Sequence, residues 1–285
     1  AQPSKRVLIY EYVIDLKEWK VFVELLENNG YSVEFLDPFN VNLTESILSS
    51  YDILVIADPD VQKVNVAQLS LIMNWVKRGG GLLVDSTYSD AQGFFVTYLS
   101  GIYVSYAKLK NLSIPFDVGE LYSPITVKLN PPLNYEVENA TLIYRGILII
   151  SGLLQGKVKA EPFGIADVKD NYTLSMSLYT ELDKGRIIVF PLQEFSNNLV
   201  IFKRKNYQLI INVFDWLSHR SPRQPDISFQ EKRLYTYLAI AAILSALTGL
   251  LVTFSYRINT SKKWLVLAIY AATIVIVGLY IWYLA

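Results

Sequence analysis

Two long apolar runs near the C-terminal end of the sequence constrain its fold more than any other feature. Residues 234–256 and 264–285 contain no charged side chain. A helix rises about 1.5 Å per residue, so either run is long enough to cross the roughly 30 Å of hydrocarbon in a bilayer. The alternative, a pair of buried core helices, is disfavoured because no other uncharged stretch of this length occurs in the chain. The sequence therefore predicts a transmembrane helical hairpin.

The charges beside these runs predict how the hairpin is oriented. The connecting segment, residues 257–263, carries three cations and no anion, which favours the cytoplasm for this loop and the exterior for the large N-terminal part. Four cations near the other end of the first run weaken this rule, namely Arg220, Arg223, Lys232 and Arg233. The chain opens at Ala1 without a methionine, as after cleavage of a signal peptide, although a recombinant start would look the same. We expect a plasma-membrane protein whose domain lies outside the cell.

Acceptor sequons for N-glycosylation support this external orientation. One of them, at Asn259, lies in the predicted cytoplasmic loop and would be unused there. The others all precede the first apolar run, where an external domain would carry them. These candidate glycosylation sites are Asn42, Asn111, Asn139 and Asn171.

The first apolar run offers a face for packing against another membrane helix. Ala242, Ala246 and Gly249 recur at helical spacing, and small residues let helix backbones approach closely. Neither run carries an ionisable side chain, so a proton or ion path is not expected. We therefore expect the partners to be other integral membrane subunits of a hetero-oligomeric complex, within the lipid bilayer.

Composition excludes several kinds of chemistry. The chain has no cysteine and one histidine, His219, so it has no disulfide, thiolate nucleophile, zinc-thiolate site or iron-sulfur cluster. We expect no metal and no cofactor. The part before the first apolar run is slightly acidic, which disfavours nucleic acid as a partner. The missing cysteine, the abundant isoleucine and tyrosine, and the sequons are typical of a thermophilic archaeal cell surface.

The N-terminal part alternates between short apolar strands and amphipathic helices. This alternation predicts right-handed βαβ units and a parallel sheet, an α/β fold. The expected strands are residues 6–12, 31–36, 53–57, 82–84 and 185–191, and the expected helices are 16–29, 44–50, 66–78 and 206–217. Residues 112–166 are predicted to be an irregular, β-rich insertion or lobe, with a strand over 141–151. We therefore expect one domain over residues 1–217, followed by a linker over 218–233.

This order of elements resembles a known superfold. The segments that carry the resemblance are residues 51–57, the stretch 74–84 with its three glycines, the strand 185–190, and the closing helix with Asn212 and Asp215. They resemble the class I glutamine-amidotransferase-like superfold over about residues 5–217. The nearest likeness is to non-catalytic, membrane-anchored branches, namely gliding-motility and intraflagellar-transport domains and the 48-kilodalton subunit of oligosaccharyltransferase. The resemblance implies a Rossmann-like, flavodoxin-like or amidotransferase-like domain.

The resemblance also identifies where a catalytic residue would lie. Catalytic members of the superfold place a cysteine on a sharp turn after the strand that follows the glycine-rich stretch, and a histidine and a glutamate complete the triad. The nearest match here is Ser86, between Asp85 and Thr87, and no imidazole is close in the sequence to accept its proton. We therefore expect a degenerate site in a protein that is not an enzyme.

A ligand site in such a fold would lie at the carboxyl ends of the strands. The residues predicted to converge there are Glu11, Asp37, Asp58, Asp60, Asp85 and Ser86. Together they could bind a cation or a hydroxyl-rich glycan. The favoured alternative is that the Asp-Pro pairs, Asp37-Pro38 and Asp58-Pro59, are ordinary turn and helix-capping residues.

Two kinds of function follow from the sequence. The first is a membrane-anchored accessory or scaffold subunit of a cell-envelope complex, for which the resemblance names an oligosaccharyltransferase as the most specific candidate. The second is a protein that binds extracellular glycans or small ligands, or a sugar-acting enzyme, using the acidic strand ends. The absent catalytic residues favour the first.

Overall fold

The structure is a computed structural model that describes most of the N-terminal part of the chain. It describes residues 4–11, 16–57, 66–85, 105–108, 124–143, 147–150, 161–168, 172–190, 201–202 and 205–230, with the isolated positions 192, 239, 240 and 249. The chain divides into two compact units, Ala1–Pro225 and Asp226–Ala285. Within the described ranges no helix has the length and apolarity that a bilayer crossing requires. Nearly all of both predicted spans, Ala242 and Ala246 included, lies outside those ranges, so the hairpin stays a prediction.

The first half of the N-terminal unit is a parallel α/β sheet, as the sequence predicts. Its strands are β1 (Lys5–Glu11), β2 (Tyr31–Leu36), β3 (Ile53–Ala57) and β4 (Gly81–Asp85), and its helices are α1 (Leu16–Asn28), α2 (Glu45–Leu48) and α3 (Val66–Lys77). All contacts between these strands are parallel, in the order β2-β1-β3-β4. The apolar runs form strands because both faces of the sheet are covered, which leaves β3 and β4 buried along their whole length.

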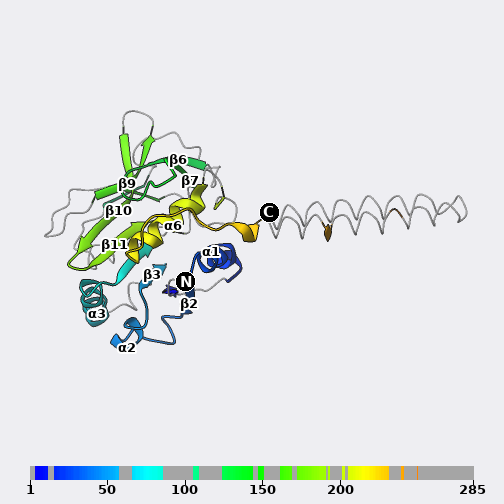
Figure 1. The fold of residues 1–285 in the computed structure, drawn as a ribbon. Coiled ribbons are helices and arrows are strands. Elements are labelled where there is room, and N and C mark those ends of the chain that lie inside the picture. Colours follow the sequence, from blue (N-terminus) through cyan, green and yellow to red (C-terminus); the bar gives the residue numbers. More distant parts are fainter. Residues whose placement is uncertain are drawn as a thin grey trace, which may run out of the picture. The chain divides into compact units, whose positions relative to one another are not determined.

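The second half extends the same sheet with antiparallel strands (Figure 1). Next to β4 lies β11 (Gly185–Phe190), which is parallel to it and leads toward α6 (Asn206–Leu217). The extension consists of β10 (Tyr172–Leu182), β9 (Glu161–Val168), β6 (Pro124–Leu129) and β7 (Asn139–Ile143). The described strands thus form a nine-stranded mixed sheet in the order β2-β1-β3-β4-β11-β10-β9-β6-β7.

The strand predicted over residues 141–151 is divided in the structure. Its first part belongs to β7 in the large sheet, and its second part is β8 (Ile147–Ile150), which pairs with β5 (Ser105–Lys108) in a separate two-stranded sheet. A continuous apolar run does not show which partner strand each half will find, because pairing depends on residues distant in the sequence. Within the segment predicted as irregular and β-rich, the described strands β6 and β7 and most of β9 lie at the far end of the main sheet.

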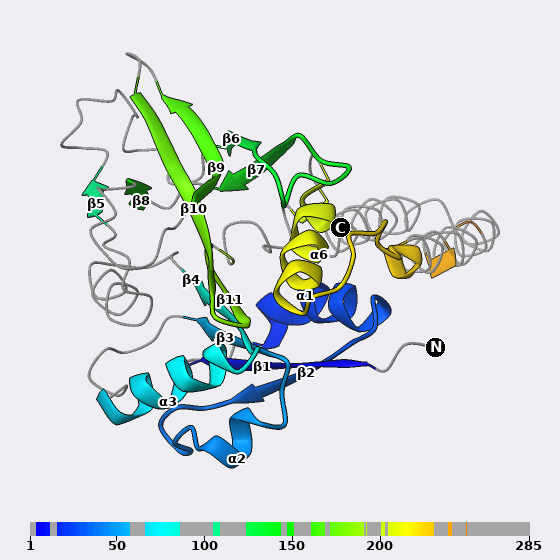
Figure 2. The same cartoon turned by 60° about the vertical axis from the view of Figure 1, so that its left-hand side comes forward.

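Two helical layers cover the parallel strands (Figure 2). On one face, Leu54, Ile56 and Val84 pack in a core cluster with side chains of α2 and α3, among them Ile72 and Trp75. The neighbouring residues of the strands point to the other face because side chains alternate along a strand. There α1 and α6 meet through Phe22 and Phe214, whose ring centroids are 5.6 Å apart. The core is therefore a three-layer sandwich.

Candidate functional site

The carboxyl edge of the parallel strands carries two buried carboxylates. Glu11 ends β1 and pairs with Ala57 of β3, while Asp85 ends β4 one register position beyond the Ile56–Val84 pair. The residues Glu11, Ala57 and Asp85 are therefore level across three adjacent strands. Residues that are level in parallel strands point to the same face, and their Cα atoms are about 4.8 Å apart per strand. Glu11 and Asp85 thus flank Ala57 on the face that α1 and α6 cover.

Both carboxylates are removed from solvent. Glu11 is 6% exposed and Asp85 is 0% exposed. One oxygen of Asp85, Oδ1, accepts a hydrogen bond of 3.0 Å from the backbone N–H of Leu192, which fastens the segment after β11 to the end of β4. Carboxylate oxygens in such a setting can accept hydrogen bonds from hydroxyl or amine groups of a ligand. In the described part of the chain, no group of three acidic, histidine or cysteine side chains could hold a metal ion.

Asp37 stabilises a turn at the end of β2. Its Oδ1 accepts a hydrogen bond of 2.8 Å from the N–H of Phe39, and its Oδ2 accepts one of 2.6 Å from Nδ2 of Asn40. This is the local pattern by which an aspartate mimics backbone in a turn. The structure therefore places Asp37 in a turn, one of the two ordinary roles that the sequence offers as the alternative. Asp58, Asp60 and Ser86 lie outside the described residues.

His219, the single imidazole of the chain, lies at the opposite edge of the sheet from Asp85. Burial lowers its pKa, and the nearby Arg186 lowers it further, while Glu181 partly offsets this. Arg186 is the second residue of β11 and pairs with Gly81 at the start of β4. The other end of β4 is about 13 Å away, at roughly 3.3 Å per residue. His219 is thus separated from the strand-end position that would need a base.

Two of the four candidate glycosylation sites are described. Asn42 is exposed, and its Oδ1 accepts a hydrogen bond of 3.2 Å from Nε2 of Gln68. The threonine of the same sequon, Thr44, caps α2 by accepting the N–H of Ile47 at 3.2 Å. Asn139 is exposed at the start of β7 and lines an open cavity of about 780 Å³ together with Glu136. Asn111 and Asn171 lie outside the described residues.

Asn212, one of the residues that carry the resemblance, positions the loop between β6 and β7. Its Nδ2 donates hydrogen bonds of 2.9 Å to the carbonyl of Leu133 and 2.8 Å to that of Tyr135. Its Oδ1 accepts a hydrogen bond of 2.9 Å from Nε2 of Gln208, one turn earlier in α6. This amide therefore holds the loop against the helix and has a structural role.

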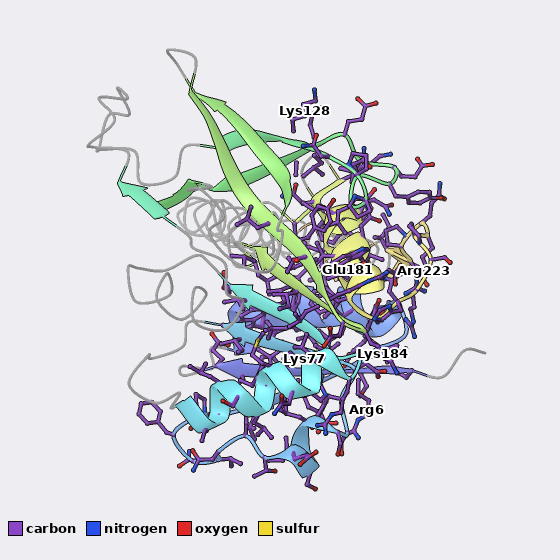
Figure 3. All side chains as sticks on the ribbon, turned by 90° about the vertical axis from the view of Figure 1, so that its left-hand side faces the viewer. Arg6, Lys77, Lys128, Glu181, Lys184 and Arg223 are labelled. Carbon is purple, nitrogen blue, oxygen red and sulfur yellow. The ribbon has the colours of Figure 1, made fainter. Side chains whose placement is uncertain are left out.

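A second polar cluster, which we did not predict, lies at the carboxyl end of α6. The buried carboxylate of Asp215 accepts a hydrogen bond of 2.6 Å from the hydroxyl of Tyr31 and one of 3.1 Å from Nε of Arg223. Burial raises the pKa of Tyr31, and the adjacent carboxylate of Asp215 raises it further. The guanidinium of Arg220 lies over the Tyr31 ring at 4.7 Å. Figure 3 shows Arg223 beside α6.

One feature of the sequence could have indicated this cluster. An aspartate in the last turn of a helix is unfavourable because the helix dipole is negative there. Asp215 occupies such a position in α6, and two arginines, Arg220 and Arg223, follow it closely. An acidic residue at a helix C-terminus followed by arginines therefore predicts that the chain turns back to pair them.

Another arginine fixes the amino edge of the sheet. Nη1 of Arg186 donates a hydrogen bond of 2.7 Å to the carbonyl of Trp216, and its guanidinium lies 4.8 Å from the centroid of the Trp216 ring. Nε of the same arginine is 3.0 Å from Glu181, which Figure 3 labels at this edge. These contacts join β11 to the end of α6.

Comparison with known proteins finds likeness in structure alone. The chain matches no protein family and no curated protein. It is similar to a glutamine amidotransferase from Thermotoga maritima, with 11% identity over 75% of this chain and 98% of that one at a TM-score of 0.47. It is similar to the glutaminase domain of CTPS from Trypanosoma brucei, with 7% identity over 79% and 98% of the two chains at a TM-score of 0.47.

An enzyme of another kind shows comparable likeness. An exo-β-1,4-mannosidase from an Opitutaceae bacterium has 11% identity over 78% of this chain and 37% of its own, at a TM-score of 0.46. We draw no functional conclusion from likenesses at these identities and scores. These likenesses all have TM-scores below 0.5, so they carry no argument for the resemblance seen in the sequence. The finer resemblance, to a membrane-anchored branch, stays a prediction.

Proposed function

We propose that this chain is a membrane-anchored, non-catalytic accessory or scaffold subunit of a cell-envelope complex, with its α/β domain outside the cell. The observation that carries the proposal is the location of the catalytic residue types. The chain has no cysteine, and its single histidine lies at the amino edge of the sheet, away from the strand-end position of a nucleophile. A serine at that position would have no imidazole beside it to accept its proton.

The apolar C-terminal part supports an anchoring role. The two runs 234–256 and 264–285 carry no charged side chain and would form a hairpin in the bilayer. Ala242, Ala246 and Gly249 would provide a face on which a partner helix can pack. The resemblance to the 48-kilodalton subunit of oligosaccharyltransferase makes an N-glycosylation complex the most specific candidate partner. Such a subunit would hold a partner in place and would leave the chemistry to it.

Native co-purification tests this proposal. The protein is extracted from its own membrane in a mild detergent, and proteins that accompany it in stoichiometric amounts are identified by mass spectrometry. We expect a reproducible set of integral membrane partners, including a catalytic oligosaccharyltransferase chain if the specific candidate is correct. The double variant A242L/A246L should lose these partners because bulky side chains prevent close helix approach. The control T248L enlarges a side chain on another face of the same helix and should retain them.

A solitary protein would overturn the accessory role. Retention of all partners by A242L/A246L would instead show that the helix face is not the contact. Extraction by alkaline carbonate would separately reject the membrane anchor, because a helical hairpin in the bilayer resists this treatment.

A second function is favoured by the two buried carboxylates at the strand ends. Glu11 and Asp85 lie on one face with strand β3 between them, at the edge where α/β folds bind ligands. If this edge binds extracellular glycans, a glycan array should show binding by the wild type that both E11Q and D85N lose. E181Q, which alters an exposed carboxylate at the other edge, should bind like the wild type. Equal binding by all four proteins would dismiss the strand-end site.

A further inference from the structure

We propose that residues 219–225 form a releasable strap, which two arginines fasten to the surface of the N-terminal unit. When the strap is fastened, the chain that connects this unit to the following segment is shorter than when the strap is released. Every residue of this strap is described. The closure stands on contacts within the N-terminal unit. Its consequence for reach rests on the membrane anchor proposed above.

The end of α6 turns the chain back on itself. The N–H of Arg220 donates to the carbonyl of Asp215 at 2.8 Å, and the N–H of His219 donates to that of Trp216 at 3.1 Å. This pair of bonds is the Schellman ending of a helix, which requires a left-handed residue. His219 supplies it, with a φ of 58°. The chain therefore reverses direction immediately after α6.

The reversed segment then runs back along α6. Gln208, near the start of this helix, donates a hydrogen bond of 2.8 Å from Nε2 to the carbonyl of Arg223. Because Arg223 follows the end of the helix and Gln208 precedes it by two turns, the strap must lie alongside α6. Residues 219–225 are thus part of the domain surface, where the sequence predicts the beginning of a linker.

Two arginines fasten the strap to the end of α1. Arg220 donates from Nη2 to the carbonyl of Gly30 at 3.1 Å and from Nη1 to that of Asn29 at 3.3 Å. Arg223 donates from Nη2 to the same Asn29 carbonyl. The last turn of α1 contains no basic residue of its own. The strap therefore brings the cations that a helix C-terminus favours, because the carbonyl groups and the dipole there are negative.

The strap is held by polar contacts to the buried carboxylate of Asp215 and to backbone carbonyls, and such contacts can exchange with water when the strap opens. None of the side chains of residues 219–225 is buried. In the central pair, the Arg223 side chain is 40% exposed, whereas that of Asp215 is 1% exposed. If Arg223 leaves, Asp215 still accepts the hydrogen bond from Tyr31. Because the strap withdraws no buried side chain of its own, it resembles segments that open without unfolding the domain.

Opening would change the reach of the domain. With the strap closed, the chain between the domain and the first apolar run is residues 226–233, which span at most about 25 Å at roughly 3.3 Å per residue. With the strap open, residues 219–233 are available and span about 50 Å. A shorter tether concentrates a domain near its anchor. The strap would therefore set the height at which the domain meets a partner.

Trypsin cleavage of the full chain in its membrane tests closure. Trypsin cuts after Arg220 and Arg223 only when the strap leaves the domain surface. Wild type should be cut at both at least tenfold more slowly than the urea-unfolded chain. D215N keeps both sites but loses the anchoring charge, so it should be cut about tenfold faster than wild type at either one. Higher salt should also increase the rate of cleavage, because salt screens the contacts of the partly exposed guanidinium groups.

Matched variants separate strap opening from unfolding. E181Q removes the charge of an exposed carboxylate that contacts Arg186 at 3.0 Å, away from the strap, and should leave strap cleavage unchanged. If D215N does not fold, R220Q keeps Asp215 and the cleavage site at Arg223, which should be cut faster. Cleavage of wild type at the unfolded rate, or no change in D215N and R220Q, would overturn the strap. Carbonate extraction with intact strap protection would reject the membrane anchor and leave the strap standing.

Discussion

The hydrogen bond from Tyr31 to Asp215 makes a measurable contribution to stability. The hydroxyl of Tyr31 donates to a buried carboxylate at 2.6 Å, and hydrogen bonds to charged groups contribute about 1.5–3 kcal/mol. The substitution Tyr31→Phe removes this donor and keeps the ring that packs on Phe214 with a centroid distance of 5.8 Å. We therefore expect Y31F to lower the free energy of unfolding by about 2 kcal/mol near neutral pH.

The pH dependence of this penalty follows from the pKa of Tyr31. Burial and the charge of Asp215 raise this pKa above its ordinary value of 10.0. A raised pKa means that the folded state holds the proton more tightly than the unfolded state. The contribution to stability is therefore complete below the ordinary pKa and is lost as the pH rises above it. One unit above that value, about 1.4 kcal/mol is lost from wild type and nothing from Y31F.

Urea unfolding of the full chain in mild detergent, followed by tryptophan fluorescence, measures both effects. The penalty of Y31F should fall from about 2 kcal/mol near pH 8 to about 0.6 kcal/mol near pH 11. Y51F is the control, because Tyr51 donates at 2.8 Å to the exposed Glu34, and we expect a penalty below about 1 kcal/mol. Equal penalties for Y31F at both pH values would refute this account of Tyr31.

Three further substitutions test close packing and backbone conformation in the N-terminal unit, each by urea unfolding. Gly185→Ala should destabilise the domain by about 3 kcal/mol or more, because a methyl group there would collide with the carbonyl of Val76; a smaller effect would contradict the close approach. Phe214→Ala should cost about 3–5 kcal/mol by leaving a cavity between α1 and α6, and a loss below 1 kcal/mol would contradict its burial. His219→Gly should stabilise by up to about 1 kcal/mol by relieving the left-handed backbone, whereas destabilisation would show that the imidazole contributes more than its φ costs.

Much of the parallel half of the domain could be predicted from the sequence. The apolar run 53–57 matches β3, and the amphipathic pattern 206–217 matches α6. These elements can be predicted because short apolar runs and helical periodicity are local sequence patterns that arise when one face of an element is buried. The acidic residues expected to converge at the strand ends do not all have the same environment in the structure. Glu11 and Asp85 are level on one face, whereas Asp37 is engaged in its own turn.

The antiparallel extension could not be ordered from the sequence. The structure joins β11 to β10 and then to β9, β6 and β7, and it divides the run 141–151 between two sheets. A strand pattern records which residues are buried, but it does not record which strand lies beside it. That choice is made by contacts between distant segments, whose cost in chain entropy and gain in burial are properties of the whole fold.

The sequence by itself determined the alternating α/β elements, the two uncharged C-terminal runs and the absence of cysteine. Only the tertiary structure decided that Asp215 meets Tyr31, 184 residues earlier, and that Arg223 returns over the end of α1. The physical reason is that periodicity and composition act over a few residues, whereas a buried charge is satisfied by whatever group the fold brings to it. The pairing of charges is therefore a consequence of the assembled layers, and so is the strap that depends on it.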